Sequence, residues 1–92
     1  MPPSLNWRAS ASADLLDIIG YIADDNPDAA QALKDEIQTK AAQLAAHPKL
    51  YKPGRMKGTR EMVIRPNYIV IYRENKTGIT ILRVLHAARQ WP

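Results

Sequence analysis

The spacing of apolar residues changes once along this chain of 92 residues, and that change sets the order of its secondary structure. Between residues 13 and 46, apolar side chains recur every three or four positions, which is the period of an amphipathic helix. Between residues 60 and 86, they form short β-branched and aromatic runs bounded by turn residues, which is typical of strands. The sequence therefore predicts a helical first half followed by a β-sheet.

A proline-containing break divides the helical half into two helices. Ser10 or Ser12 is predicted to cap a first helix that runs to about residue 24, with Asp14 in its first turn. Asn26 is predicted to cap the second helix, because a proline follows it at the position where helices accept one. This helix should end at His47, because a residue that precedes a proline avoids helical dihedrals. The tight turn between the helices predicts an antiparallel hairpin.

Three strands are predicted in the second half, at residues 60–65, 68–73 and 79–86. Turn residues separate them, with a proline and an asparagine at the first turn and a glycine at the end of the second. The last strand is predicted to be central and covered by the helices on one side, because both of its faces are largely apolar. One of these faces is expected to hold Ile79, Ile81, Arg83 and Leu85. A further short segment, residues 4–7, follows two prolines and is predicted to be an edge strand.

The predicted element order is β-α-α-β-β-β, which places the chain in the α+β class, with a helical hairpin packed on an antiparallel sheet. A chain of this length builds one hydrophobic core, so residues 1–92 are expected to form a single domain. The absence of cysteine excludes disulfides and thiolate ligands, and two histidines make a metal site or cofactor unexpected. No apolar stretch is long enough to cross a bilayer, so a soluble, cytoplasmic protein is expected.

Charge is distributed unevenly between the two halves. Residues 1–46 carry three Lys or Arg against seven Asp or Glu, a net charge of −4, whereas residues 47–92 carry ten against two, a net charge of +8. The second half is therefore predicted to form a continuous positive surface, which includes a basic loop at residues 49–57. Such a surface attracts polyanions. The alternative is an ordinary solvated face that maintains solubility.

Three phrases in this order resemble the ParE/RelE superfamily of toxins. They are Gly-Thr-Arg-Glu-Met-Val-Ile at residues 58–64, Tyr-Ile-Val-Ile-Tyr-Arg at 68–73 and Ile-Leu-Arg-Val-Leu-His at 81–86. The resemblance covers essentially the whole chain and implies the β-α-α-β-β-β toxin fold. It also implies a type II toxin–antitoxin system, in which a cognate antitoxin lies over the helices and sheet and forms a hetero-oligomer with the toxin.

The resemblance implies two alternative targets. ParE-like toxins poison DNA gyrase so that cleaved DNA accumulates, whereas RelE-like toxins are endoribonucleases that cut mRNA in the ribosomal A site. RNA cleavage without a metal needs an acid, a base and cations around the phosphorane. Arg65 stands where the RelE-like pattern has a phosphate-binding arginine, and His86 has the acid–base chemistry, so these two are the catalytic candidates. The alternative for His86 is a packing role.

Gyrase is the favoured target, because RelE-like nucleases typically have a tyrosine near the end of the chain and none follows His86 here. The ending Arg-Val-Leu-His is common among ParE-like toxins. The expected target-binding residues are cations and one terminal aromatic, which would make a strong interface pair with a neighbouring arginine. They are Lys57, Arg60, Arg65, Arg83, Arg89 and Trp91. The remaining alternatives are a ribosome-dependent nuclease, with ribosome and mRNA as partners, and a degraded relative that only binds its antitoxin.

Overall fold

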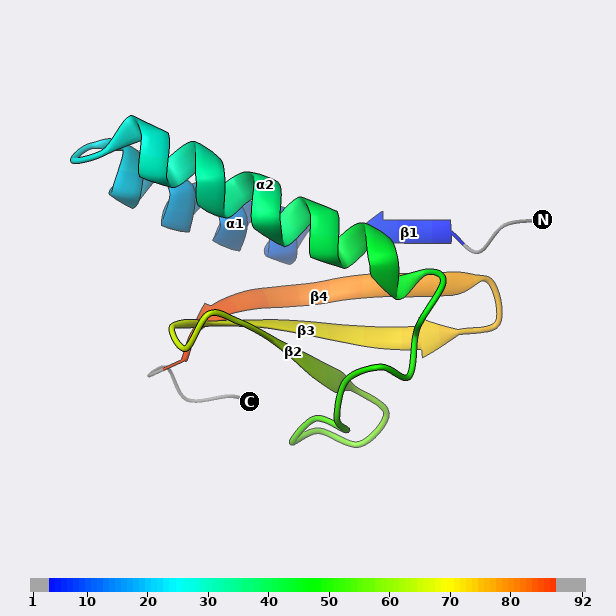
Figure 1. Cartoon of the computed structure of the whole chain (residues 1–92). Helices are drawn as coiled ribbons and strands as arrows, with labels where there is room; N and C mark the ends of the chain where they lie inside the picture. Colours follow the sequence, from blue (N-terminus) through cyan, green and yellow to red (C-terminus); the bar gives the residue numbers. More distant parts are fainter. Residues whose placement is uncertain (1–3, 88–92) are drawn as a thin grey trace.

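The computed structural model describes residues 4–87, which form four strands and two helices in the predicted order (Figure 1). The strands are β1 (Ser4–Trp7), β2 (Arg60–Ile64), β3 (Tyr68–Asn75) and β4 (Gly78–His86), and the helices are α1 (Ala9–Ala23) and α2 (Pro27–Leu44). None of the helices in this part of the chain is long and apolar enough to cross a membrane. The architecture is the expected α+β arrangement of a helical hairpin on a sheet.

The strands form one sheet in the order β1-β4-β3-β2, so β4 is central, as predicted. The pairs β2–β3 and β3–β4 are antiparallel, but β1 pairs in parallel with β4, from Ser4 opposite Gly78 to Trp7 opposite Ile81. The sheet is therefore mixed, not antiparallel throughout. In Figure 1, α2 runs back toward the end of the sheet where β1 begins, so β2 runs in the same direction as β1. Because β2, β3 and β4 alternate in direction, β4 is also parallel to β1.

A β-bulge interrupts the predicted alternation along β4. Tyr72 pairs with Ile81, whereas the preceding Ile71 pairs with Arg83, so Leu82 is an extra residue in the ladder. As a result, Ile81 lies in the helix-side core, and Leu82 lies in a second cluster with Ile71 on the other side of the sheet. Beyond the bulge the two faces are exchanged, so that Val84 lies in the helix-side core and Leu85 in the second cluster. The prediction that residues 79, 81, 83 and 85 share one face was wrong, because strict alternation assumes an uninterrupted ladder.

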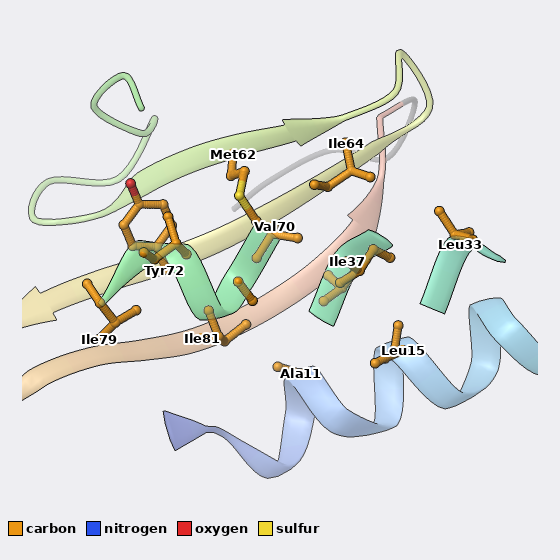
Figure 2. Packing of buried hydrophobic residues seen from close by; sticks show 13 residues of the cluster. Ala11, Leu15, Leu33, Ile37, Met62, Ile64, Val70, Tyr72, Ile79 and Ile81 are labelled. Atoms are coloured by element: carbon orange, nitrogen blue, oxygen red, sulfur yellow. The ribbon is translucent and has the colours of Figure 1, made fainter. Parts of the chain in front are cut away.

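The main core lies between the helical hairpin and one face of the sheet. Figure 2 shows strand side chains such as Val70 pointing toward Ile37 of α2 and Leu15 of α1. The buried members of this cluster are Ala11, Leu15, Leu33, Ile37, Ala41, Leu44, Met62, Ile64, Val70, Tyr72, Ile79, Ile81 and Val84. Tyr72 is fully buried, and its hydroxyl donates to the carbonyl of Pro48 at 3.1 Å. This bond satisfies the polar end of the ring and holds the chain segment that leaves α2.

The starts of the two helices differ from each other in how they are capped. Asn26 caps α2 as predicted, and its side-chain oxygen accepts from the backbone N–H of Ala29 at 3.1 Å. Helix α1 begins earlier than either candidate serine suggested, with Arg8 in the cap position and no side-chain cap. Ser10 instead donates its hydroxyl to the carbonyl of Leu82 at 3.0 Å, so it joins α1 to β4.

Gly78 is required where β1 meets β4. Its φ is +150°, and a Cβ atom at this position would collide with the backbone of Ser4. We predict that Gly78→Ala lowers the free energy of unfolding by about 1–3 kcal/mol, the usual cost of overpacking. Gly20→Ala is the matched control, because open space surrounds that position on α1 and alanine favours a helix. Urea denaturation of both variants checks this, and equal effects at the two positions would contradict it.

Candidate functional site

Arg65 lies at the turn between β2 and β3 and is held by α2. Its φ is 54°, so this residue adopts the left-handed conformation of the turn. The Nε and Nη2 atoms of its guanidinium each lie 3.0 Å from Oε1 of Glu36. Lys40, one turn further along α2, also pairs with Glu36, at 3.4 Å. The sequence-predicted phosphate-binding arginine is thus part of a surface ion-pair network between the helical hairpin and the sheet.

The Glu36 carboxyl is kept charged by this network. Burial acts to raise its pKa, but hydrogen bonds from Arg65 and Lys40, together with the attraction of both cations, lower the pKa below its ordinary value. The ionised carboxylate in turn offsets the positive charge of Arg65. An arginine in this state is less available to a substrate phosphate than the sequence suggested.

His86 ends β4 and lies in ring contact with Tyr68, the first residue of β3. The ring centroids are 5.6 Å apart and the planes meet at 82°, an edge-to-face arrangement. Both residues line a hollow of about 320 Å³ between the sheet and α1. The other lining residues are Asp17, Ile18, Tyr21 and Ile22. The structure thus places His86 beside a tyrosine that precedes it in the sequence.

Arg83 is fixed at the bulge of β4 by Asp14 of α1. Its Nε and Nη2 atoms lie 2.7 and 3.1 Å from the two carboxylate oxygens, and the same carboxylate accepts from the backbone N–H of Val84 at 3.0 Å. The hydrogen bond with Asp14 raises the pKa of Arg83, so it stays charged. The prediction that Asp14 lies in the first turn of α1 was wrong, because the helix begins at Ala9. The Asp14 carboxylate accepts hydrogen bonds from β4 and does not interact with the start of the helix.

The basic connection before β2 is an organised turn. Gly54 donates its N–H to the carbonyl of Thr59 at 2.7 Å, and the buried carboxylate of Glu61 accepts from the N–H of Arg55 at 2.9 Å. Lys57 lies exposed in this turn. These backbone contacts fix the turn from which the cations project, so its geometry is set before any partner binds.

The positive residues of the second half do not form an uninterrupted basic surface. Carboxylates lie among them, in the pairs Arg65–Glu36, Arg83–Asp14 and Arg55–Glu61. Two of these carboxylates come from the acidic first half, which the helical hairpin folds back onto the sheet. The predicted continuous positive surface was therefore wrong, because charge balance along the sequence does not determine which side chains meet in space.

The sequence-predicted site residues fall into three groups. Arg65 and Arg83 pair with helix carboxylates, as described above, and Arg60 donates to the carbonyl of Tyr51 at 2.7 Å. Lys57 and His86 are exposed in the basic turn and at the end of β4. Arg89 and Trp91 lie outside the described residues, and their proposed role stays a prediction.

Sequence reasoning did not connect Tyr21 and Tyr68, which share the hollow with His86. Tyr21 is 83% exposed although it lies in a helix rich in apolar residues. Together with Leu16, which is 72% exposed, it gives α1 apolar side chains on the side away from the core. The signal was present in the sequence, because the apolar residues of this helix exceed what one buried stripe requires.

Comparisons with known proteins agree with this architecture. The family model described as the ParE toxin of the type II toxin–antitoxin system parDE matches residues 5–91. The chain belongs to the ParE toxin family. The putative toxin Y4kP of Sinorhizobium fredii is 40% identical over 96% of this chain and 92% of its own length. Toxin RelE2 of Caulobacter vibrioides is 36% identical over 90% of this chain and 93% of its own length.

Solved structures show the same fold. The chromosomal ParDE toxin–antitoxin system from P. aeruginosa matches with a TM-score of 0.81 and 25% identity, over 92% of this chain and 96% of the other. The E. coli DinJ-YafQ toxin–antitoxin complex matches with a TM-score of 0.67 and 17% identity, over 96% of each chain. The chain is thus a toxin of a type II toxin–antitoxin system within the ParE/RelE superfamily, which supports an antitoxin as its partner.

The ion-pair network around Glu36 predicts a pH dependence of stability. Because the pKa of Glu36 is lowered by folding, its contribution is fully present above the ordinary value of 4.5 and is lost as the pH falls through the lower folded pKa. We predict that Glu36→Gln costs roughly 0.2–1 kcal/mol at pH 7, as expected for a partly exposed pair. Thermal unfolding from pH 7 to pH 3 checks this.

The Glu36→Gln difference should shrink toward zero at the acid end of that range. Glu74→Gln is the control, because it removes one exposed carboxylate of β3 away from this network. A Glu36→Gln effect that is equally large at pH 3, or no larger than the control effect at pH 7, would contradict the prediction.

Proposed function

We propose that this toxin inhibits DNA gyrase by binding the gyrase–DNA complex and preventing religation, without catalysing a reaction itself. Membership of the ParE family supports this target, as does the structural match to the ParDE system. On this proposal the cations and aromatics of the chain serve binding, and the target-binding residues are those predicted from the sequence, including Arg89 and Trp91.

The observation that carries the proposal is the state of Arg65. A nuclease that works without a metal needs cations directed at the phosphate that changes charge in the transition state. The Nε and Nη2 nitrogens of Arg65 both contact Glu36 at 3.0 Å, so this guanidinium is directed at α2. Cations paired with carboxylates suit an interface more than they suit stabilisation of a phosphorane.

One observation favours the RelE-like alternative, a ribosome-dependent mRNA endoribonuclease. The contact between His86 and Tyr68 brings an imidazole and a phenol together, which is a pair able to exchange protons with a substrate. The relative from Caulobacter vibrioides also has the name RelE2. On this alternative His86 acts as acid or base, and Arg65 has to leave Glu36 to meet the phosphate.

Parallel assays on purified protein separate the two functions. We expect wild-type toxin to accumulate cleaved DNA with gyrase and to leave mRNA in translating ribosomes uncut. His86→Ala and Tyr68→Phe should keep this activity within about threefold, because binding at a partner interface depends on a few anchors. A chain that ends at residue 88 should lose it. Transcripts cut in the A site by wild type but not by His86→Ala would contradict the gyrase proposal.

We further propose that the antitoxin covers the exposed side of α1. Tyr21 and Ile22 line both the hollow beside His86 and a second hollow of about 600 Å³, whose other lining residues are Asp24, Asp25, Asn26 and Ala29. Apolar side chains with carboxylates at their border suit a partner helix that carries apolar residues next to Lys or Arg. An antitoxin segment is the occupant, because this chain belongs to a toxin–antitoxin family.

Tyr21 is the predicted anchor of that contact. Tyr21→Ala should weaken antitoxin binding at least tenfold, since a large aromatic near the centre of an interface contributes on the order of 2 kcal/mol or more. The fold should persist because the side chain is 83% exposed. Leu50→Ala is the control, as Leu50 is 62% exposed but lies outside both hollows. Titration calorimetry measures both, and equal affinities for the two variants would refute the assignment.

A further inference from the structure

A third hollow, on the other side of the sheet, is lined by three arginines from separate segments. It measures about 210 Å³, and its lining residues are Arg8, Ser10, Met56, Thr59, Arg73, Leu82 and Arg83. The turn that holds Met56 lies on the side of the sheet away from the helices (Figure 1). Arg8 precedes α1, Arg73 belongs to β3 and Arg83 lies at the bulge of β4. Arg73 and Arg83 lie on paired neighbouring strands, whereas Arg8 is far from both in the sequence and is brought to them by the fold.

The three arginines differ in how they are held. Arg83 uses two N–H groups for Asp14, which fixes the guanidinium and leaves its remaining donors for a ligand. Arg8 and Arg73 are exposed and have no ion pair with any acidic residue between positions 4 and 87. The hollow thus contains three guanidinium groups against the one carboxylate of Asp14, and the excess of positive charge favours an anion.

The size and surroundings of the hollow indicate which anion. At about 210 Å³ it is below the usual volume for a drug-sized ligand, so it suits a small ionic group. Guanidinium groups match phosphate oxygens in geometry and hydrogen bonding. Arg55 and Lys57 lie in the turn that supplies Met56, so further cations border the same side. A series of cations suits a repeating anion, such as a nucleic-acid backbone, more than a single carboxylate.

We propose that this hollow binds a backbone phosphate of the DNA segment held by gyrase. This inference rests on the proposed function, because it assigns the part of the toxin that contacts DNA within the gyrase complex. Arg83, positioned by Asp14, and the exposed arginines Arg8 and Arg73 surround the phosphate. The contact is independent of base sequence, since it involves the backbone alone. The hollow is also separate from the α1 surface that we assign to the antitoxin.

The test compares two double variants that remove the same charge. Arg8→Ala/Arg73→Ala removes both exposed arginines of the hollow, and Lys49→Ala/Lys76→Ala removes two exposed lysines outside it. Binding of a short DNA duplex to each protein is measured by fluorescence anisotropy over a series of salt concentrations. A single-stranded RNA of equal length serves as a second probe. Antitoxin binding is measured in parallel and reports that each variant is folded.

The arginine variant should bind the duplex at least tenfold more weakly, because charge-assisted hydrogen bonds are lost. The negative slope of log affinity against log salt should become less steep by about 0.9, which corresponds to the loss of one phosphate contact. The lysine variant should keep most of the affinity. Both variants should bind the antitoxin as wild type does, and the arginine variant should trap less cleaved DNA with gyrase.

Equal losses of DNA affinity in the two double variants would overturn the proposal, because net charge alone would then explain binding. A loss confined to the RNA probe would also overturn it. Loss of antitoxin binding in the arginine variant with unchanged DNA binding would assign the hollow to an acidic antitoxin side chain instead. Failure of the proposed gyrase function gives a different result: the arginine-dependent DNA affinity is present, but wild-type toxin accumulates no cleaved DNA.

Discussion

The carboxylate of Asp14 joins the helical layer to the sheet at the point where the sheet is least regular. It accepts two bonds from the guanidinium of Arg83 and one from the backbone N–H of Val84. Without Asp14 that backbone N–H would lose this acceptor, which is costly for a partly buried group. One side chain of α1 therefore holds both the backbone and an arginine beside the bulge. The hydrophobic clusters on the two sides of β4 depend on the same bulge, because it sets which residues of β4 face each side.

This arrangement divides the molecule into surfaces with different chemistry. On the helix side, α1 uses one face for the core and leaves apolar residues such as Tyr21 exposed beside acidic ones. On the other side, arginines from three segments converge near the bulge. An apolar, acidic surface and a cationic hollow suit two partners of different kinds, which agrees with a toxin that has to meet both an antitoxin and a target. The geometry also allows the two contacts to be tested separately by substitution.

Much of the fold followed from local rules. The helices, the three strands of the second half and the Asn26 cap were predicted because each depends on residues close in the sequence. The start of α1 was wrong, because Ser10 finds an acceptor on β4 and leaves the cap position to Arg8. The parallel pairing of β1 with β4 was also missed, since it depends on the path of the helical hairpin and not on either strand alone.

By itself, the sequence determined the order of the elements, the α+β class and the family, because periodicity, turn residues and strand phrases are local properties of the chain. Only the tertiary structure decided which charges neutralise one another and which remain for a partner. Glu36 meets Arg65 across 29 positions and Asp14 meets Arg83 across 69, whereas Arg8 and Arg73 converge without acidic partners among the described residues. The physical reason is that ion pairing depends on distances of a few ångströms between side chains, which the fold sets and the composition of each half does not.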